Sequence, residues 1–251
     1  MLLEGKNAVI YGAGGSIGSA VARAFASEGA KIFLAGRTRL KLEEVAQQIR
    51  SAGGVAETAQ VDAIDEQAVD QHADAVAASA GSIDVSFNLI SYGDVQGTPL
   101  AEMPLQDFER PVMTAVRTRF LTSRAAARHM IRQGSGVILF FGGYGDPVPD
   151  YYMGGFQVAL NAIESLRRQL ASELGGHGIR TVTLQTGGVP ETIPESFDVR
   201  EEINEMIVGQ TMLKRAATLE DVGNVAAFAA SDHARTMTAT ALNISCGAIV
   251  D

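Results

Sequence analysis

Short apolar runs alternate along the whole chain with longer stretches in which apolar residues return every three or four positions. The first run, residues 8–11, precedes Ile17, Val21 and Phe25, which are spaced as on one face of a helix. The apolar runs continue at 32–35, 55–61, 83–90, 137–141, 179–184 and 241–244. Strands this apolar are covered by helices on both faces, so the pattern predicts an α/β fold with a doubly wound parallel sheet and right-handed crossovers.

The length of 251 residues favours one domain over the whole chain, residues 1–251. A (β/α)₈ barrel is the competing topology. Thr218-Leu219-Glu220-Asp221 has capping-box spacing for a helix over 221–230. The segment 187–211 shows no clear periodicity and is rich in Pro and Glu, so we expect a mobile substrate lid there.

The charge balance excludes some classes of partner. Lys and Arg number 20 against 29 Asp and Glu, a net charge of −9, which is the wrong sign for a protein that neutralises nucleic-acid phosphates. The single cysteine, Cys246, closes no intrachain disulfide, and four scattered histidines predict no metal site. No leader segment or membrane-length apolar run is evident, so we expect a soluble cytoplasmic protein without a membrane partner.

A glycine-rich turn follows the first apolar run and leads straight into a helix, with the sequence Gly12-Ala13-Gly14-Gly15-Ser16-Ile17-Gly18. Glycines in this position let backbone N–H groups approach a pyrophosphate, which then lies at the positive end of the helix dipole. An ordinary tight turn is the alternative. Three further features favour the phosphate-binding interpretation: Asp62 and Asn88 end later strands, and Gly187 and Gly188 follow another.

With these features the chain resembles the short-chain dehydrogenase/reductase family, from Gly5 to Asp251. The resemblance implies a Rossmann-type sheet of about seven strands. Gly12 and Gly18 match the outer glycines of the family motif, while Ser16 stands in place of the usual middle glycine. Asn88-Leu89-Ile90-Ser91 keeps only the first residue of the family's Asn-Asn-Ala-Gly motif, and Cys246-Gly247 replaces a closing Gly-Gly.

The resemblance also implies the cofactor contacts. Asp62 matches the carboxylate that family members place against the adenine amino group. The cofactor-binding set implied by the motifs is Gly12, Gly14, Gly15, Ser16, Ile17, Gly18, Arg37, Asp62, Ala63, Asn88, Gly187 and Val189.

The end of the second strand indicates which dinucleotide is bound. An acidic residue at Gly36 would accept hydrogen bonds from an unphosphorylated ribose and repel a 2′-phosphate, but a small residue followed by the guanidinium of Arg37 stands there. NADP(H) is therefore favoured over NAD(H). Arg39 is equally basic, so a solvated arginine at the helix entry is the alternative interpretation of Arg37.

The catalytic residues are where the resemblance fails. Most family members use Asn, Ser, Tyr and Lys, and the flanking sequence places Ala115, Gly143, Phe156 and Leu160 at those positions. No Tyr-x-x-x-Lys occurs anywhere, and no lysine lies between Lys41 and Lys214. The usual proton-transfer machinery is therefore predicted to be missing.

Phenols nevertheless lie near the expected substrate pocket. Tyr144, Tyr151 and Tyr152 precede Phe156, and Tyr152 stands one position from the site that the enoyl-reductase branch uses for its tyrosine. Lowering a tyrosine pKa from about 10 to about 7 needs roughly 4 kcal/mol of anion stabilisation, which the missing lysine would supply. Alcohol oxidation is therefore hindered, but a neutral phenol can still assist reduction. Tyr152 is the candidate catalytic residue; a purely structural role lining an apolar pocket is the alternative.

The helix before residue 137 is strongly basic, with Arg110, Arg117, Arg119, Arg124, Arg128 and Arg132. A polyanion site is one interpretation, but a solvated or subunit-contacting face is favoured, because this helix forms a dimer interface in family members. Asp107, Glu109 and Asp146 are expected to be ordinary surface partners.

Two functions remain open. The first is an NADP(H)-dependent reductase of a small carbonyl or activated alkene with a non-standard proton donor, assembled as a homo-dimer or homo-tetramer. The second is a catalytically silent dinucleotide-binding protein that serves as a sensor or partner subunit.

Overall fold

The computed structural model describes residues 1–142, 151–196 and 198–250. Its centre is a seven-stranded parallel sheet with the order β3-β2-β1-β4-β5-β6-β7. The strands are β1 (Asn7–Tyr11), β2 (Lys31–Gly36), β3 (Val55–Gln60), β4 (Val85–Asn88), β5 (Gly136–Gly142), β6 (Ile179–Gln185) and β7 (Thr240–Asn243). This open sheet confirms the doubly wound prediction and excludes the barrel.

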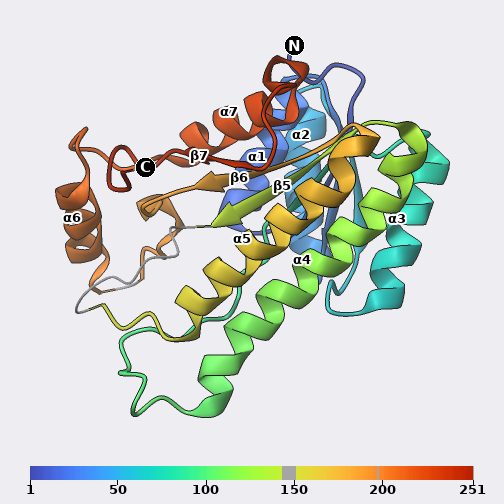
Figure 1. Ribbon diagram of the computed structural model, residues 1–251. Helices are drawn as coiled ribbons and strands as arrows, with labels where there is room; N and C mark the ends of the chain where they lie inside the picture. The colour runs from blue at the N-terminus through green and yellow to red at the C-terminus, as the bar shows by residue number, and fades with distance from the viewer. Residues whose placement is uncertain (143–150, 197, 251) are drawn as a thin grey trace.

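Helices cover both faces of the sheet. They are α1 (Ser16–Ser27), α2 (Arg39–Ser51), α3 (Glu66–Ala80), α4 (Leu105–Gln133), α5 (Gly155–Leu174), α6 (Arg200–Gln210) and α7 (Leu219–Ala230). In Figure 1, α3, α4 and α5 lie side by side in front of the sheet, and α1, α2 and α7 lie behind it. Alternate residues of one strand serve the two layers, since Ile10 packs with the α1 side and Val9 with the α4 side.

Local signals in the sequence fix where helices begin. The Asp65 side chain accepts hydrogen bonds from the backbone N–H groups of Gln67 and Ala68 at the start of α3. At the start of α7, Thr218 and Asp221 form the reciprocal hydrogen bonds of a capping box. The capping box expected at Thr218 is therefore confirmed.

One apolar run extends beyond its strand, and the segment without clear periodicity contains a helix. The fourth strand ends at Asn88 and not at residue 90, because the Ile90 N–H turns to the Asn88 side chain. The segment 187–211 contains a short 3₁₀ helix, Pro190–Thr192, and then α6. No residue of α6 is buried, so the helix shows no apolar period in the sequence. It stands at one side of the molecule in Figure 1.

A buried phenol and imidazole meet between β1 and α3. The Tyr11 hydroxyl lies 3.2 Å from His72 Nδ1, and the two rings meet edge to face at a centroid distance of 5.6 Å. Burial lowers the pKa of His72 to about 4. Burial, with a smaller contribution from Asp70, raises the pKa of Tyr11. The imidazole is therefore neutral in the folded protein at all but strongly acidic pH.

Acid is expected to destabilise the protein through His72. His72 takes up its proton near pH 6.5 in the unfolded chain and only near pH 4 in the folded chain. Between these values the unfolded state binds more protons, so the free energy of unfolding decreases as the pH is lowered. Between pH 7 and pH 4.5 the wild type should lose about 2 kcal/mol more than His72→Gln, measured by urea unfolding. Equal losses in the two proteins would show that His72 is protonated without cost.

Candidate functional site

The glycine turn between β1 and α1 leaves no room for side chains at two positions. Gly12 has a φ of +79°, and a Cβ there would lie 2.7 Å from the carbonyl carbon and oxygen of Leu89. A Cβ at Gly18 would run into the carbonyl oxygen of Gly12. Glycine is therefore required at both outer positions of the motif, and Ser16, which is exposed at the start of α1, meets no such restriction.

The first turn of α1 has the properties of an anion site. Gly15 is the N-cap residue, no side chain caps the turn, and the turn holds no acidic residue. Its backbone N–H groups and the positive end of the helix dipole therefore face outward without a neutralising carboxylate. A dinucleotide pyrophosphate fits this cradle, with Gly14, Gly15, Ser16 and Ile17 as the residues that would hold it.

The other predicted cofactor residues lie at the same edge of the sheet. Tyr11, which precedes Gly12, pairs with Ala35 of β2 and with Asn88 of β4, so three strand ends meet at the glycine turn. Arg37 directly follows β2, and its side chain is exposed. Asp62 is exposed after β3, where its carboxylate accepts the N–H of Ile64 at 3.2 Å, and Ala63 beside it is buried.

Asn88 is held rigidly at the end of β4. Its side chain is 4% exposed, donates to the Thr122 hydroxyl at 3.1 Å and accepts the N–H of Ile90 at 3.1 Å. The side chain thus fixes the chain to α4 at the point where β4 leaves the sheet. Gly187 and Val189 follow β6, and a Cβ on Gly187 would lie 2.9 Å from the Cβ of Ala248.

Lys41 is a basic residue beside the glycine turn that the sequence did not single out. A Cβ on Gly14 would lie 2.9 Å from the Cβ of Lys41, and both residues line a hollow of about 280 Å³ with Ser16, Arg23 and Glu44. This hollow opens at the start of α1, where an additional phosphate would meet more positive than negative charge. The sequence feature that could have indicated Lys41 is its position four residues after Arg37.

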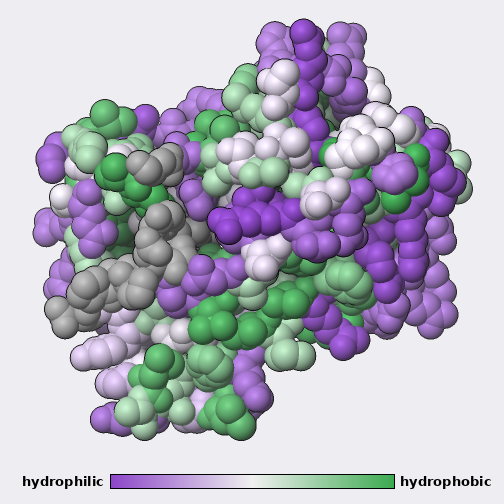
Figure 2. All heavy atoms as spheres, in the orientation of Figure 1, coloured by the Kyte–Doolittle hydropathy of each residue, from purple (hydrophilic) through white to green (hydrophobic). Residues whose placement is uncertain are grey.

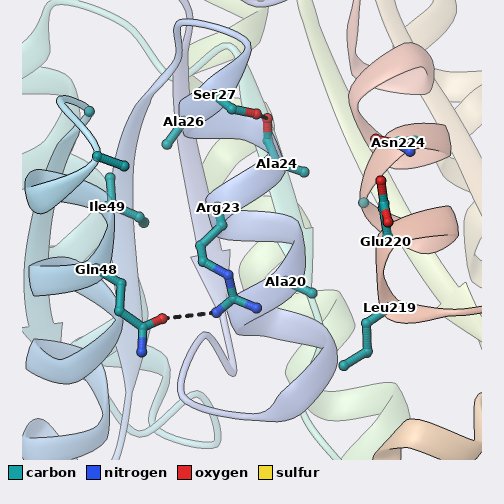
Figure 3. Close-up of a pocket in the computed structure, with 13 residues that line it drawn as sticks. Ala20, Arg23, Ala24, Ala26, Ser27, Gln48, Ile49, Leu219, Glu220 and Asn224 are labelled. Atoms are coloured by element: carbon teal, nitrogen blue, oxygen red, sulfur yellow. Dashed lines mark hydrogen bonds between the residues drawn. The ribbon is translucent and has the colours of Figure 1, made fainter.

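A larger hollow of about 450 Å³ lies between α1, α2 and α7 (Figure 3). Small residues such as Ala20, Ala24 and Gly223 line it, and Arg23 Nη1 donates to Gln48 Oε1 at 3.1 Å across it. Its lining includes no residue of the glycine turn, but it shares Arg23 and Gln48 with the smaller hollow.

Three of the four residues that were expected at the family's catalytic positions, Ala115, Phe156 and Leu160, lie in one apolar cluster. Ala115 and Leu160 are 0% and 1% exposed and pack with Ile163, Tyr92 and the half-buried Phe156. Gly155 brings α5 close to α4 here, because a Cβ on it would run into the carbonyl of Phe108. The cluster contains one ionisable side chain, that of Tyr92. Gly143 and Tyr144 lie outside the described residues.

Tyr92 and Arg119 also lie in this region, although the sequence pattern did not place either of them there. The Tyr92 hydroxyl donates to the carbonyl of Phe141 at 3.1 Å, and its ring centroid lies 5.5 Å from that of Phe156. The Arg119 guanidinium carbon stands 4.3 Å from the Tyr92 ring centroid. Burial raises the pKa of Tyr92, although the Arg119 charge acts in the opposite direction.

Tyr152 lies outside the apolar cluster. Its side chain is 49% exposed, and its backbone carbonyl accepts the N–H of Gly97 at 2.8 Å. Tyr151 is 38% exposed. An exposed phenol is accessible to a substrate, whereas the buried Tyr92 hydroxyl donates its hydrogen bond to the backbone carbonyl of Phe141.

The basic face of α4 is largely neutralised within the chain. Arg124 pairs with Glu66 at 2.8 Å and with Asp70, and Arg128 also pairs with Asp70 at 2.9 Å. Arg110 pairs with Asp107, as expected, while Asp146 lies outside the described residues. Arg119 was wrongly grouped with this surface, because it lies on the buried face of α4, one turn after Ala115.

The described residues contain neither a metal-ligand cluster nor a membrane-spanning helix. In residues 1–142, 151–196 and 198–250, no group of His, Cys, Asp and Glu side chains is arranged to hold a metal ion. Within the same ranges, no helix combines the length and apolar character that a membrane crossing needs.

Comparisons with known proteins agree with this geometry. Residues 12–248 match the family model described as enoyl-(acyl carrier protein) reductase. The uncharacterized oxidoreductase YxbG of Bacillus subtilis (strain 168) is 30% identical over 236 residues, which cover 92% of this chain and 86% of the relative.

Solved structures agree over nearly the full length. NAD⁺-bound xylitol dehydrogenase is 26% identical with a TM-score of 0.88, covering 98% of this chain and 100% of the other. The 7α-hydroxysteroid dehydrogenase complexed with NADH and 7-oxo glycochenodeoxycholic acid is 27% identical with a TM-score of 0.87, covering 99% and 96%.

Proposed function

This chain belongs to the short-chain dehydrogenase/reductase family, whose members are oxidoreductases that use NAD(H) or NADP(H), and on that premise we propose that it is an NADP(H)-dependent reductase. Its substrate would be a small carbonyl compound or an activated alkene. The observation that carries the proposal is the glycine turn at the uncapped start of α1, beside the exposed Arg37 and Lys41.

The preference for the phosphorylated cofactor rests on this chain's own residues. The two solved relatives hold NAD⁺ and NADH. Here β2 ends in Gly36, against which Leu42 packs, and Arg37 follows with no carboxylate at that position. A guanidinium and an ammonium near the ribose would attract a 2′-phosphate, whereas an unphosphorylated ribose gains little from either.

We expect NADPH to bind at least about tenfold more tightly than NADH, since a charged hydrogen bond contributes roughly 1.5–3 kcal/mol. Nucleotide fluorescence titrations would measure both affinities. Arg37→Ala should remove most of the difference, and Arg39→Ala, which changes an equally basic neighbour, should preserve it. Equal affinities of the wild type for NADPH and NADH would overturn the cofactor assignment.

The proposed direction of reaction follows from the proton donors present. The bound cofactor would supply hydride, and neither Phe156 nor Leu160 can supply a proton. Lowering a tyrosine pKa from about 10 to about 7 requires roughly 4 kcal/mol of preferential anion stabilisation, and the family's lysine is replaced by Leu160. A neutral phenol such as Tyr152 can still donate a proton or hydrogen bond to a carbonyl that accepts hydride.

Tyr152→Phe is therefore expected to lower kcat/KM for reduction of a reactive diketone by about 100-fold, while the affinity for NADPH stays unchanged. Tyr151→Phe is the matched control and should keep its activity. Oxidation across a panel of alcohols should be absent or very slow in the wild type. Rapid alcohol oxidation, or full reductase activity in Tyr152→Phe, would contradict this assignment.

The closed apolar cluster around Leu160 favours a second candidate function. A protein that binds NADPH as described and turns over no substrate would be a catalytically silent dinucleotide-binding sensor or partner subunit. NADPH binding without reduction of carbonyl compounds or activated alkenes distinguishes this candidate from the reductase.

We also propose that copies of the chain associate as homo-dimers or homo-tetramers in the cytoplasm. Apolar side chains gather on the surface formed by α4 and α5 (Figure 2). Met113, Phe120 and Val158 are 62%, 44% and 43% exposed on these helices. Burying these apolar side chains against a second copy of the chain would remove them from water and so favour association.

A further inference from the structure

Arg119 is the largest fully buried side chain in the described part of the chain, with an exposed fraction of 2%. No Asp or Glu among the described residues forms an ion pair with it. The other deeply buried arginine of this layer, Arg167, is 3% exposed and binds the Glu164 carboxylate at 2.8 and 3.0 Å. Arg119 therefore carries a buried charge that lacks the partner such charges normally have.

The hydrogen bonds of Arg119 are long for a charged donor. Nη1 and Nη2 lie 3.5 and 3.4 Å from the carbonyl oxygen of Ile90, and Nη2 lies 3.5 Å from that of Asn88. Nη1 is 3.4 Å from the Thr118 hydroxyl, and Nε has no partner in the described residues. Charged N–H groups normally approach oxygen to about 2.7–2.9 Å, so these dipoles compensate the charge only weakly.

The carboxylates nearest to this region do not neutralise Arg119. Asp94 and Glu164 act on Tyr92, whose pKa they raise, but Glu164 is already bound to Arg167 and to the Thr183 hydroxyl. Burial lowers the pKa of Arg119 itself, and Tyr92 is the one ionisable group that acts against this. An arginine remains protonated at neutral pH despite such a shift.

The charge lies beneath the edge at which a dinucleotide would bind. Asn88 ends β4, and β4 pairs with Tyr11, the residue before Gly12. The β1–β4 boundary is where the strand order reverses, and dinucleotides cross the strand ends at that point. The pyrophosphate would lie at α1, and the nicotinamide would lie beyond it, toward the Tyr92 and Phe156 side.

Resting on the proposed function, we propose that Arg119 makes the site bind reduced NADPH in preference to oxidised NADP⁺. The nicotinamide ring of NADP⁺ carries a positive charge, and the ring of NADPH is neutral. An uncompensated cation nearby repels the first and leaves the second unaffected. Two unit charges about 10 Å apart at an effective dielectric constant of about 20 repel each other strongly enough to change a binding equilibrium about tenfold.

Arg119 would therefore assist cofactor exchange and would not assist the hydride step. It favours loading with NADPH and release of NADP⁺ after turnover. The same charge opposes formation of the cationic ring during hydride donation, so it is a residue that sets cofactor preference and not a catalytic residue.

The test is the ratio of the dissociation constants of NADP⁺ and NADPH, measured by calorimetry without substrate. The ratio should fall about tenfold in Arg119→Met and remain close to the wild-type value in Arg119→Lys. Arg128→Met is the matched control, because it removes an exposed, ion-paired arginine of the same helix and should leave the ratio unchanged. ADP-ribose 2′-phosphate, a compound that lacks the nicotinamide ring, should bind the wild type and Arg119→Met with equal affinity.

An unchanged ratio in folded Arg119→Met would overturn the inference and leave Arg119 as a brace for the segment 88–92. Should Arg119→Met fail to fold, the wild type can still overturn the inference, because equal affinities for NADP⁺ and NADPH would contradict it. A wild type that binds no nicotinamide nucleotide would instead overturn the proposed function.

Discussion

Gly12→Ala is expected to abolish NADPH binding and to lower the free energy of unfolding by about 3 kcal/mol. The φ of +79° alone costs a residue with a side chain roughly 1–2 kcal/mol. The new Cβ would also lie 2.7 Å from the Leu89 carbonyl group and 2.8 Å from the Ile90 nitrogen. These are backbone atoms next to the rigidly held Asn88, so they cannot move away as a flexible side chain could.

Gly15→Ala is the matched control in the same turn. A Cβ there would have the Gly12 oxygen as its nearest neighbour, at an ordinary contact distance of 3.5 Å, and Gly15 has a φ of −87°. Its cost in stability should remain below about 1 kcal/mol, as expected at a helix N-cap. Urea unfolding and NADPH titration of the two variants measure the contrast. Equal stability of Gly12→Ala and Gly15→Ala would show that the turn relaxes freely.

The fold could be predicted because both of its periodicities are local. Ala8 to Tyr11 and Ile32 to Ala35 are continuous apolar runs since each strand is buried on two faces, and α1 carries Val21 and Phe25 on its inner side. Residues at strand ends, such as Asn88 and Asp62, follow from the same pattern, because parallel strands bring their carboxyl ends to one edge. Strand ends themselves depend on single hydrogen bonds, which is why β4 ends at Asn88 although the apolar run continues to Ile90.

The interior of the catalytic side could not be predicted in the same way. Tyr92 follows β4 in an irregular segment, so no period indicates that its ring enters the cluster of Ala115 and Leu160. Arg119 did carry a signal, since it stands four residues after the buried Ala115 on one helix. That signal was outweighed by the surrounding arginines, whose side chains are exposed or paired with α3. A buried cation is revealed only by the packing of helix against strand.

Leu160→Lys is expected to destabilise the protein by about 4 kcal/mol. Leu160 is 1% exposed, packs with Ile163, and its Cδ2 would lie 3.1 Å from a Cβ on Gly142. An ammonium placed there has no carboxylate partner in the cluster, and Arg119 already stands against the Tyr92 ring. A buried, unpaired charge costs several kcal/mol. Leu160→Met keeps the site apolar and of similar volume, so it should cost less than about 1.5 kcal/mol.

NADPH binding tests whether the destabilising ammonium at residue 160 faces the nicotinamide ribose. If residue 160 stands where the family's lysine holds the nicotinamide ribose, as the sequence predicts, NADPH would give the new ammonium its partner. NADPH at a hundredfold excess over its dissociation constant stabilises any binding-competent variant by about 2.7 kcal/mol, and Phe156→Tyr with Leu160→Lys should gain more than the wild type does at equal NADPH concentration. Melting temperatures with and without NADPH measure this difference. A gain no larger than that of the wild type would mean that residue 160 does not face the ribose, and that the alignment of Phe156 and Leu160 with the family's tyrosine and lysine is wrong.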